Sequence, residues 1–133
     1  MKLFFAAVLL FVSLGISGRS VIYGQPAKHI TVKIHREVVH RGGLRVRFIS
    51  IVEDSRCPTD TNCIWAGNAK IRMRVTKSGR AKDIEMHTNG PNNTVAVNGY
   101  SLTLMKLTPE PRSNIRINPN GYVATIKISR SRG

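Results

Sequence analysis

Residues 69–75 read Ala-Lys-Ile-Arg-Met-Arg-Val, so apolar side chains alternate strictly with cationic ones. A period of two places successive side chains on opposite faces of a β-strand, one buried and the other in water. The same alternation recurs in six further runs, at residues 30–34, 44–48, 84–86, 95–97, 100–104 and 122–128. After residue 27 no stretch of ten residues keeps an apolar stripe at helical spacing, so the pattern predicts an all-β fold.

Turn-forming segments separate these runs at the spacing of a β-sandwich. They are Arg41-Gly42-Gly43, Ser78-Gly79, Asn89-Gly90-Pro91, Asn98-Gly99 and Asn120-Gly121. The alternation slips by one residue after Phe48 and again after Leu104, which predicts a bulge in each strand. Pro109 and Pro111 exclude a central strand and predict a crossing loop over residues 108–119. About seven strands in roughly 105 residues predict a single two-sheet, immunoglobulin-like sandwich.

The N-terminal segment has the order of a secretory signal peptide. A positive start, Met1-Lys2, precedes an apolar run over residues 3–14, and small residues follow at Gly15, Ser17 and Gly18. The uncharged stretch ends at Arg19 and is shorter than the ~20 residues that span a bilayer, although a permanent membrane anchor is the alternative. We expect a signal peptide over residues 1–24 and a sandwich domain over 25–133, frayed from Lys127 onward. The protein is therefore expected to be secreted or periplasmic.

Positive charge is the strongest compositional feature. The chain has 21 Lys and Arg residues against 7 Asp and Glu, a net charge of +14, which falls to +12 without residues 1–24. Five cations lie at outward positions of two predicted strands, namely Arg45, Arg47, Lys70, Arg72 and Arg74. If those strands are neighbours, the cations lie within one Debye length of each other and form an anion-binding face for a polyanion. The alternative is a generally cationic, solvated surface with no dedicated partner.

The chain has two cysteines, Cys57 and Cys63, which bracket five residues. In an exported protein this pair is predicted to form a disulfide that braces the irregular connection before residue 69. Four aromatic residues remain after residue 24, namely Phe48, Trp65, Tyr100 and Tyr122, and we expect them in the core. For Trp65 the alternative is an exposed indole used for ligand contact. Four aromatics make a poor stacking platform, so no specific nucleic-acid readout is expected.

Two neighbouring segments, Glu53–Pro58 and Cys63–Ala69, resemble a group of small exported bacterial proteins and lipoproteins. These share an Asp-Ser-Arg-Cys-Pro, four residues, Cys-x-Trp-Ala-Gly pattern. The segments Gly99–Leu104 and Leu107–Pro111 also resemble this group, which extends the similarity over most of residues 44–128. The resemblance implies an exported protein and no particular activity. Unlike the lipoproteins, this chain has no lipid-acceptor cysteine after its apolar run.

The sequence contains no catalytic, phosphate-binding or dinucleotide-binding motif, so we expect neither an enzyme nor a cofactor. Asp54, Asp60 and Asn62 carry oxygen ligands, but without the spacing of a calcium loop they are expected to form turns. For Asp54 an ion pair with Arg56 or a strand arginine is also open. His29 and His35 lie too far apart along one strand to share a metal ion.

These observations favour a non-catalytic binding or envelope-associated module, with phosphate-rich lipids, wall polymers or acidic glycans as anionic partners. Two functions of other classes remain open. One is a protein-binding module of the enzyme-inhibitor type that uses the Cys57–Cys63 loop as a wedge. The other is an extracytoplasmic thiol-redox protein that uses the same two cysteines.

Overall fold

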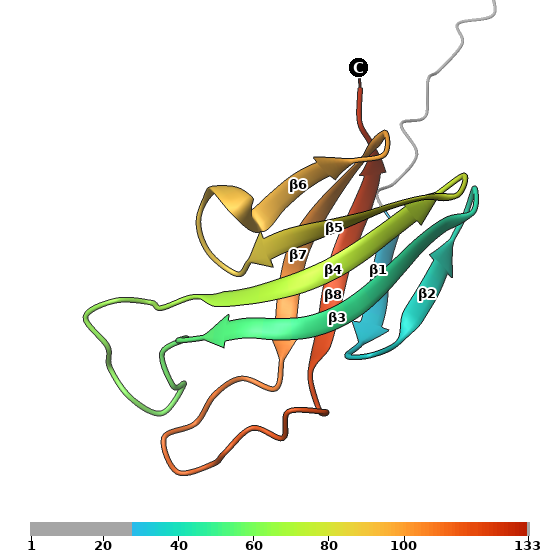
Figure 1. Cartoon of the computed structure of the whole chain (residues 1–133). Helices are drawn as coiled ribbons and strands as arrows, with labels where there is room; N and C mark the ends of the chain where they lie inside the picture. The colour runs from blue at the N-terminus through green and yellow to red at the C-terminus, as the bar shows by residue number, and fades with distance from the viewer. Residues whose placement is uncertain (1–27, 133) are drawn as a thin grey trace, which may run out of the picture.

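The computed structural model describes residues 28–132, which form two four-stranded antiparallel sheets packed face to face (Figure 1). The elements are β1 (Lys28–Lys33), β2 (Glu37–His40), β3 (Leu44–Asp54), β4 (Ala69–Lys77), β5 (Arg80–His87), the 3-10 turn η1 (Pro91–Asn93), β6 (Thr94–Val97), β7 (Tyr100–Thr108) and β8 (Val123–Arg130). This confirms the all-β sandwich. Within residues 28–132 no helix is long and apolar enough to cross a bilayer. The predicted signal peptide, residues 1–24, lies outside the described residues.

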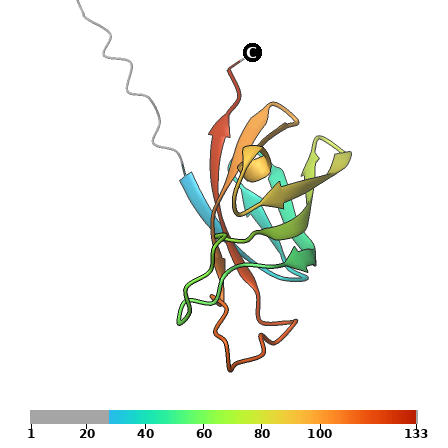
Figure 2. The ribbon, with the colours of Figure 1, turned by 90° about the vertical axis from the view of Figure 1, so that its left-hand side faces the viewer.

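Each sheet is built mainly from strands that follow one another in the chain. One sheet has the order β2-β3-β4-β5, and the other has the order β1-β8-β7-β6. The chain therefore crosses between the layers after β1 and after β5, as the two views in Figures 1 and 2 show. The immunoglobulin-like character extends to the two-layer architecture, whereas this strand order, two consecutive meanders, was not predicted.

The inward positions of all the alternating runs meet between the two sheets. The largest fully buried side chains come from both layers and include Phe48, Met73, Met86, Leu102 and Ile126. Among the described residues no polar or charged residue is fully buried. All the described strands and the core between them lie within residues 28–132, so this segment has its own hydrophobic core, as an independently folding domain requires.

The core position predicted for Phe48, Tyr100 and Tyr122 is confirmed, but the one predicted for Trp65 is wrong. Phe48 is fully buried, whereas Trp65 is 81% exposed. Trp65 lies in an irregular segment that ends before β4 begins at Ala69, so no strand directs its side chain between the sheets. Methionine, leucine and isoleucine fill the space instead.

Two further details of the strands differ from the prediction. An eighth strand, β2, pairs with β3 along the sheet edge. Its adjacent valines break the alternation, since Val38 faces inward and Val39 is 65% exposed. Fraying from Lys127 is also wrong for residues 127–130, because Ile128 is buried between Lys28 of β1 and Leu102 of β7.

The predicted irregularities are confirmed where the alternation slips. The β3–β4 register shifts between Phe48 and Ser50, and the β7–β8 register shifts between Leu104 and Lys106. A further shift follows between Ile51 and Glu53. The hairpin turns Ser78-Gly79 and Asn98-Gly99 have both residues at positive φ, which is the two-residue turn that matches strand twist.

Core and surface aromatics should differ sharply in their contribution to stability. Phe48→Ala is expected to lower the free energy of unfolding by about 3–5 kcal/mol, because it leaves a cavity between the sheets. Trp65→Ala should change it by less than about 0.5 kcal/mol, because the indole is exposed. Urea denaturation followed by circular dichroism measures both values. Similar losses in the two variants would contradict the placement of Trp65.

Candidate functional site

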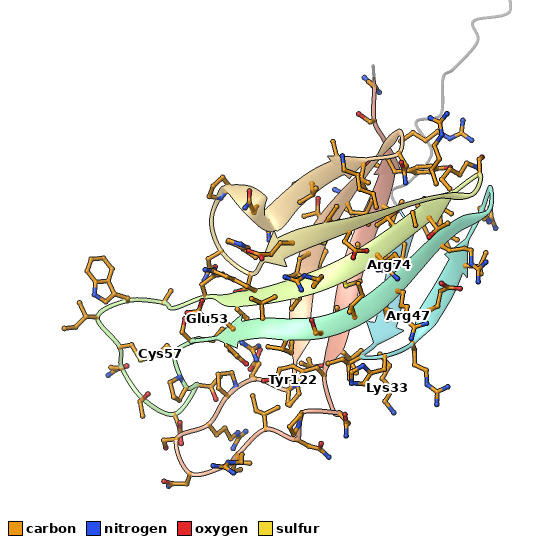
Figure 3. All side chains as sticks on the ribbon, in the orientation of Figure 1. Lys33, Arg47, Glu53, Cys57, Arg74 and Tyr122 are labelled. Atoms are coloured by element: carbon orange, nitrogen blue, oxygen red, sulfur yellow. A yellow bond between two sulfur atoms is a disulfide. The ribbon has the colours of Figure 1, made fainter. Side chains whose placement is uncertain are left out.

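The five cations predicted to form an anion-binding face do lie together. β3 and β4 are neighbours, Arg47 pairs directly opposite Arg74, and all five side chains point away from the core. Figure 3 labels Arg47 and Arg74 on these two adjacent strands. Lys127, by contrast, lies on the outer face of the other sheet.

Acidic residues from the flanking strands largely neutralise this face. Arg45 Nη2 lies 2.5 Å from Glu37 Oε1, and Arg74 Nε lies 2.7 Å from Asp83 Oδ1. Lys70 Nζ lies 3.2 Å from a Glu53 carboxylate oxygen at the end of β3. Glu85 on β5, which pairs opposite Arg72, adds a fourth carboxylate to this face. Among the described residues, only Arg47 and Arg72 of the five cations form no ion pair.

The second candidate site is the loop between β3 and β4, which the predicted disulfide closes. Cys57 and Cys63 are bonded, with their Cα atoms 5.9 Å apart. Beyond the strands the two arms of the loop stay paired: the N–H of Ser55 donates to the carbonyl of Asn68 at 2.8 Å, and that of Cys57 to the carbonyl of Ala66 at 3.1 Å. The disulfide and this short ladder together fix both stems of the loop.

The loop carries exposed apolar side chains immediately after the disulfide. Ile64 is 94% exposed and Trp65 is 81% exposed. A single exposed apolar side chain is ordinary, whereas a group of them at one place marks an interaction site. Five of the six large exposed apolar side chains in the described chain belong to the loops at this end or to the strands leading into them, namely Val52, Ile64, Trp65, Met105 and Ile115.

Gly67 sets the path of the chain between Trp65 and β4. Its φ is +70°, and a Cβ placed there would lie 2.0 Å from the carbonyl oxygen of Ser55. A side chain is therefore excluded by the opposite arm of the loop. Asn89, which follows β5, also holds Gly67 in place, since its Nδ2 donates to the carbonyl of Gly67 at 2.6 Å.

A largely buried charged cluster joins the base of the loop to the other sheet. Arg56 binds both carboxylate oxygens of Asp54, with Nε at 2.8 Å and Nη2 at 2.7 Å, and each side chain is only 11–12% exposed. The same guanidinium donates to the carbonyls of Leu107 at 2.7 Å and Pro109 at 2.9 Å. Tyr122 donates its hydroxyl to Asp54 at 2.9 Å. The sequence suggested the Asp54–Arg56 pair but not its burial or its third member.

The cluster shifts the pKa values of its members in opposite directions. Burial alone disfavours the carboxylate of Asp54, but hydrogen bonds from Arg56 and Tyr122 outweigh it and hold the pKa of Asp54 below its ordinary value. Burial, together with the hydrogen bond to Asp54, raises the pKa of Tyr122 to about 12. Both shifts favour the charge states present at neutral pH.

A second loop, residues 109–122, is bound to the side of the first. The N–H of Thr59 donates to the carbonyl of Pro111 at 2.9 Å, and Asp60 accepts from the N–H of Ser113 at 3.0 Å and from its hydroxyl at 2.6 Å. Asp54 and Asp60 are thus engaged by protein donors. Among residues 28–132, no three His, Cys, Asp or Glu side chains gather as a metal-binding group.

A shallow groove of about 300 Å³ lies between the disulfide loop and β7. Its lining includes Cys57, Ala66, Asn89, Met105 and Pro111. Ala66, which lines the groove, directly follows Trp65 in the chain, so the groove and the exposed Trp65 belong to the same loop. We name this surface, formed by Ile64, Trp65 and the groove, the loop surface.

The close approach at Gly67 can be tested against a glycine in open space. Gly67→Ala is expected to cost about 3 kcal/mol or more, because Ser55 must move and the paired stems separate. Gly79→Ala is the matched control, since its φ is +75° but nothing lies within 4 Å of the added Cβ. It should cost about 1 kcal/mol. Equal losses in thermal denaturation would show that the stems do not approach so closely.

The Tyr122 hydroxyl predicts a specific alkaline instability. An unfolded tyrosine ionises near pH 10, whereas Tyr122 in the folded protein ionises near 12. The raised pKa of Tyr122 therefore contributes about 2–3 kcal/mol to the stability of the folded protein below pH 10. This contribution is lost as the pH rises toward 12. Tyr122→Phe should cost about 1–2 kcal/mol at pH 7 and flatten this decline, measured by urea denaturation at several pH values. A variant with the wild-type slope would exclude Tyr122 as the cause.

Comparison with known proteins adds no further assignment. No family model, no curated protein and no solved structure matches the chain.

Proposed function

We propose that this protein is an exported, non-catalytic binding module that recognises a protein partner through the loop surface. The observation that carries the proposal is Trp65, which is 81% exposed on a segment held by a disulfide and by paired stems. Tryptophan is enriched among the residues that dominate binding energy in protein interfaces. The groove on the same loop, lined by Cys57 and Ala66, offers a place for a side chain of the partner.

The rigidity of the loop favours such a role. Association costs less when the contacting segment is already ordered, because little conformational entropy remains to be lost. Burying the indole against a partner removes on the order of 200 Å² of apolar surface, which contributes about 5 kcal/mol before the costs of association. Trp65 with Ile64 beside it can therefore supply the centre of an interface, which smaller polar contacts would surround.

An exported location, secreted or periplasmic, is part of this proposal. Its support is the signal-like order of residues 1–24 together with the Cys57–Cys63 disulfide, since disulfides persist in oxidising compartments. The thiol-redox alternative has less support. The disulfide belongs to the frame of the loop surface, and no free cysteine accompanies it in the described chain.

The polyanion function expected of Arg45, Arg47, Lys70, Arg72 and Arg74 has weaker support than the protein-binding function. Three of these cations form ion pairs, so the strand face contributes little net positive charge. An anionic partner would have to compete with Glu37, Glu53 and Asp83 for them.

The loop surface can be tested by a binding scan on residues 25–133 with extracts of the native envelope and its surroundings. A specific partner should be retained by the wild-type protein and lose at least about 30-fold in affinity with Trp65→Ala, because the indole is the proposed centre of the interface. Val39→Ala is the matched control, an exposed apolar side chain on the β2 edge, and should bind as wild type. Trp65 emission should also shift to shorter wavelength in the complex. A partner whose affinity is unchanged by Trp65→Ala would refute the proposal.

A further inference from the structure

The end of the sandwich farthest from the Cys57–Cys63 loop gathers cations from four separate parts of the chain. They lie at the start of β1, in the β2–β3 turn, in the β4–β5 hairpin and at the end of β8. We name this surface the cationic end, and its residues are Lys28, Arg41, Lys77, Arg80, Arg130 and Arg132. All except the half-buried Lys77 are exposed.

Hydrogen bonds hold these turns side by side. Lys77 donates its ammonium group to the carbonyl of Gly42, which links the β4–β5 hairpin to the β2–β3 turn. Asn98 donates to the carbonyl of Arg80 at 3.3 Å, and the N–H of Ser131 donates to the carbonyl of Gly99 at 3.0 Å. The β6–β7 turn therefore connects the hairpin that carries Lys77 and Arg80 to the C-terminal strand that carries Arg130.

The N-terminal strand completes the group. Lys28 pairs opposite Ile128, two residues before Arg130. His40, at the end of β2, has a pKa below its ordinary value because of burial and because of the charges on Lys28 and Arg41. The two sheets thus contribute cations to the same end of the molecule.

Within the described chain no acidic residue belongs to this end. The nearest acids along the strands are Glu37, four residues before Arg41, and Asp83, three residues after Arg80. Both are already ion-paired, with Arg45 and Arg74 respectively. Six cations on adjoining turns lie within about one Debye length of their neighbours and create a positive potential that the paired strand face lacks.

The position of the chain ends selects the class of partner. The apolar run of residues 3–14 precedes Lys28, and Lys28 begins β1 at this same end, beside the C-terminus of β8 (Figure 1). On the exported location proposed above, the signal peptide is removed at the membrane, so the mature chain is released with this N-terminal, cationic end nearest the lipid. Anionic phosphate headgroups are the matching charges there.

We propose that the cationic end binds an anionic lipid surface and orients the loop surface away from it. Binding is the sum of Coulomb contacts between exposed Lys and Arg side chains and phosphate groups, without insertion of apolar side chains. The disulfide loop lies at the opposite end of β3 and β4 from the turns that carry Arg41 and Arg80, so Trp65 stays in water while the protein is bound.

The test uses residues 25–133 and vesicles of phosphatidylcholine with or without phosphatidylglycerol, separated by sedimentation. The protein should bind only the phosphatidylglycerol vesicles and be released at high salt. Each basic residue near an anionic surface contributes about fivefold, so the double variant Arg41→Glu and Arg80→Glu should bind about 30-fold or more weakly. The matched control, Arg47→Glu and Arg72→Glu, changes the net charge equally and should lose less than about threefold.

Trp65 emission provides the orientation readout. It should be unchanged on binding to vesicles and unaffected by quenchers in the headgroups, whereas a blue shift would place Trp65 in the lipid and overturn the proposal. Equal binding to both kinds of vesicle, or equal loss in the two double variants, would also overturn it. Binding to heparin but not to phosphatidylglycerol would make the surface a polysaccharide site instead. Apart from a blue shift, which would assign the indole to the lipid, these outcomes leave the proposed binding of a protein partner by Trp65 unaffected.

Discussion

The guanidinium group of Arg56 is the contact on which the geometry of the loop end depends. It holds both oxygens of Asp54 at the end of one sheet and caps the carbonyls of Leu107 and Pro109 as the chain leaves the other. Tyr122 closes the cluster just before β8. A lysine could not replace Arg56, because only the planar guanidinium group, with its several N–H donors, reaches the Asp54 carboxylate and both carbonyls at once. Such a pair contributes less to net stability than to selecting one arrangement of two loops.

That arrangement gives the molecule two ends with different chemistry. The core between the sheets is wholly apolar, so it specifies the sandwich but no function. At one end, polar contacts hold an apolar indole out in water, whereas at the other, short turns bring unpaired cations together. Four of the seven acids, Glu53, Asp54, Asp60 and Glu110, lie at or near the loop end, which leaves the opposite end without compensation. The loop surface and the cationic end both result from the strand topology, because it decides which connections meet at each end of the sandwich.

The sequence predicted the sandwich because period-two alternation survives at nearly every inward position. It also located the bulges after Phe48 and Leu104, since a shift in facing leaves two neighbouring apolar residues. It failed where facing is not coded locally: β2 was missed because Val38 and Val39 are adjacent, and Trp65 lies in a segment with no pleat. The neutralised strand face was hidden because Glu37 and Asp83 come from strands whose pairing depends on sheet order. Tyr122 joins Asp54 across 68 residues, which no spacing rule reveals.

The strand order has a practical consequence for how the protein can be handled. β1 begins, and β8 ends, at the same pole of the sandwich, opposite the disulfide (Figure 1). A fusion partner, affinity tag or sensor-chip linkage joined directly to either end of the described chain therefore leaves the indole unobstructed. The same attachment crowds the cationic end, where both ends of the described chain lie. Immobilised protein is thus a fair reagent for finding ligands of the disulfide loop and a misleading one for measuring attraction to charged surfaces.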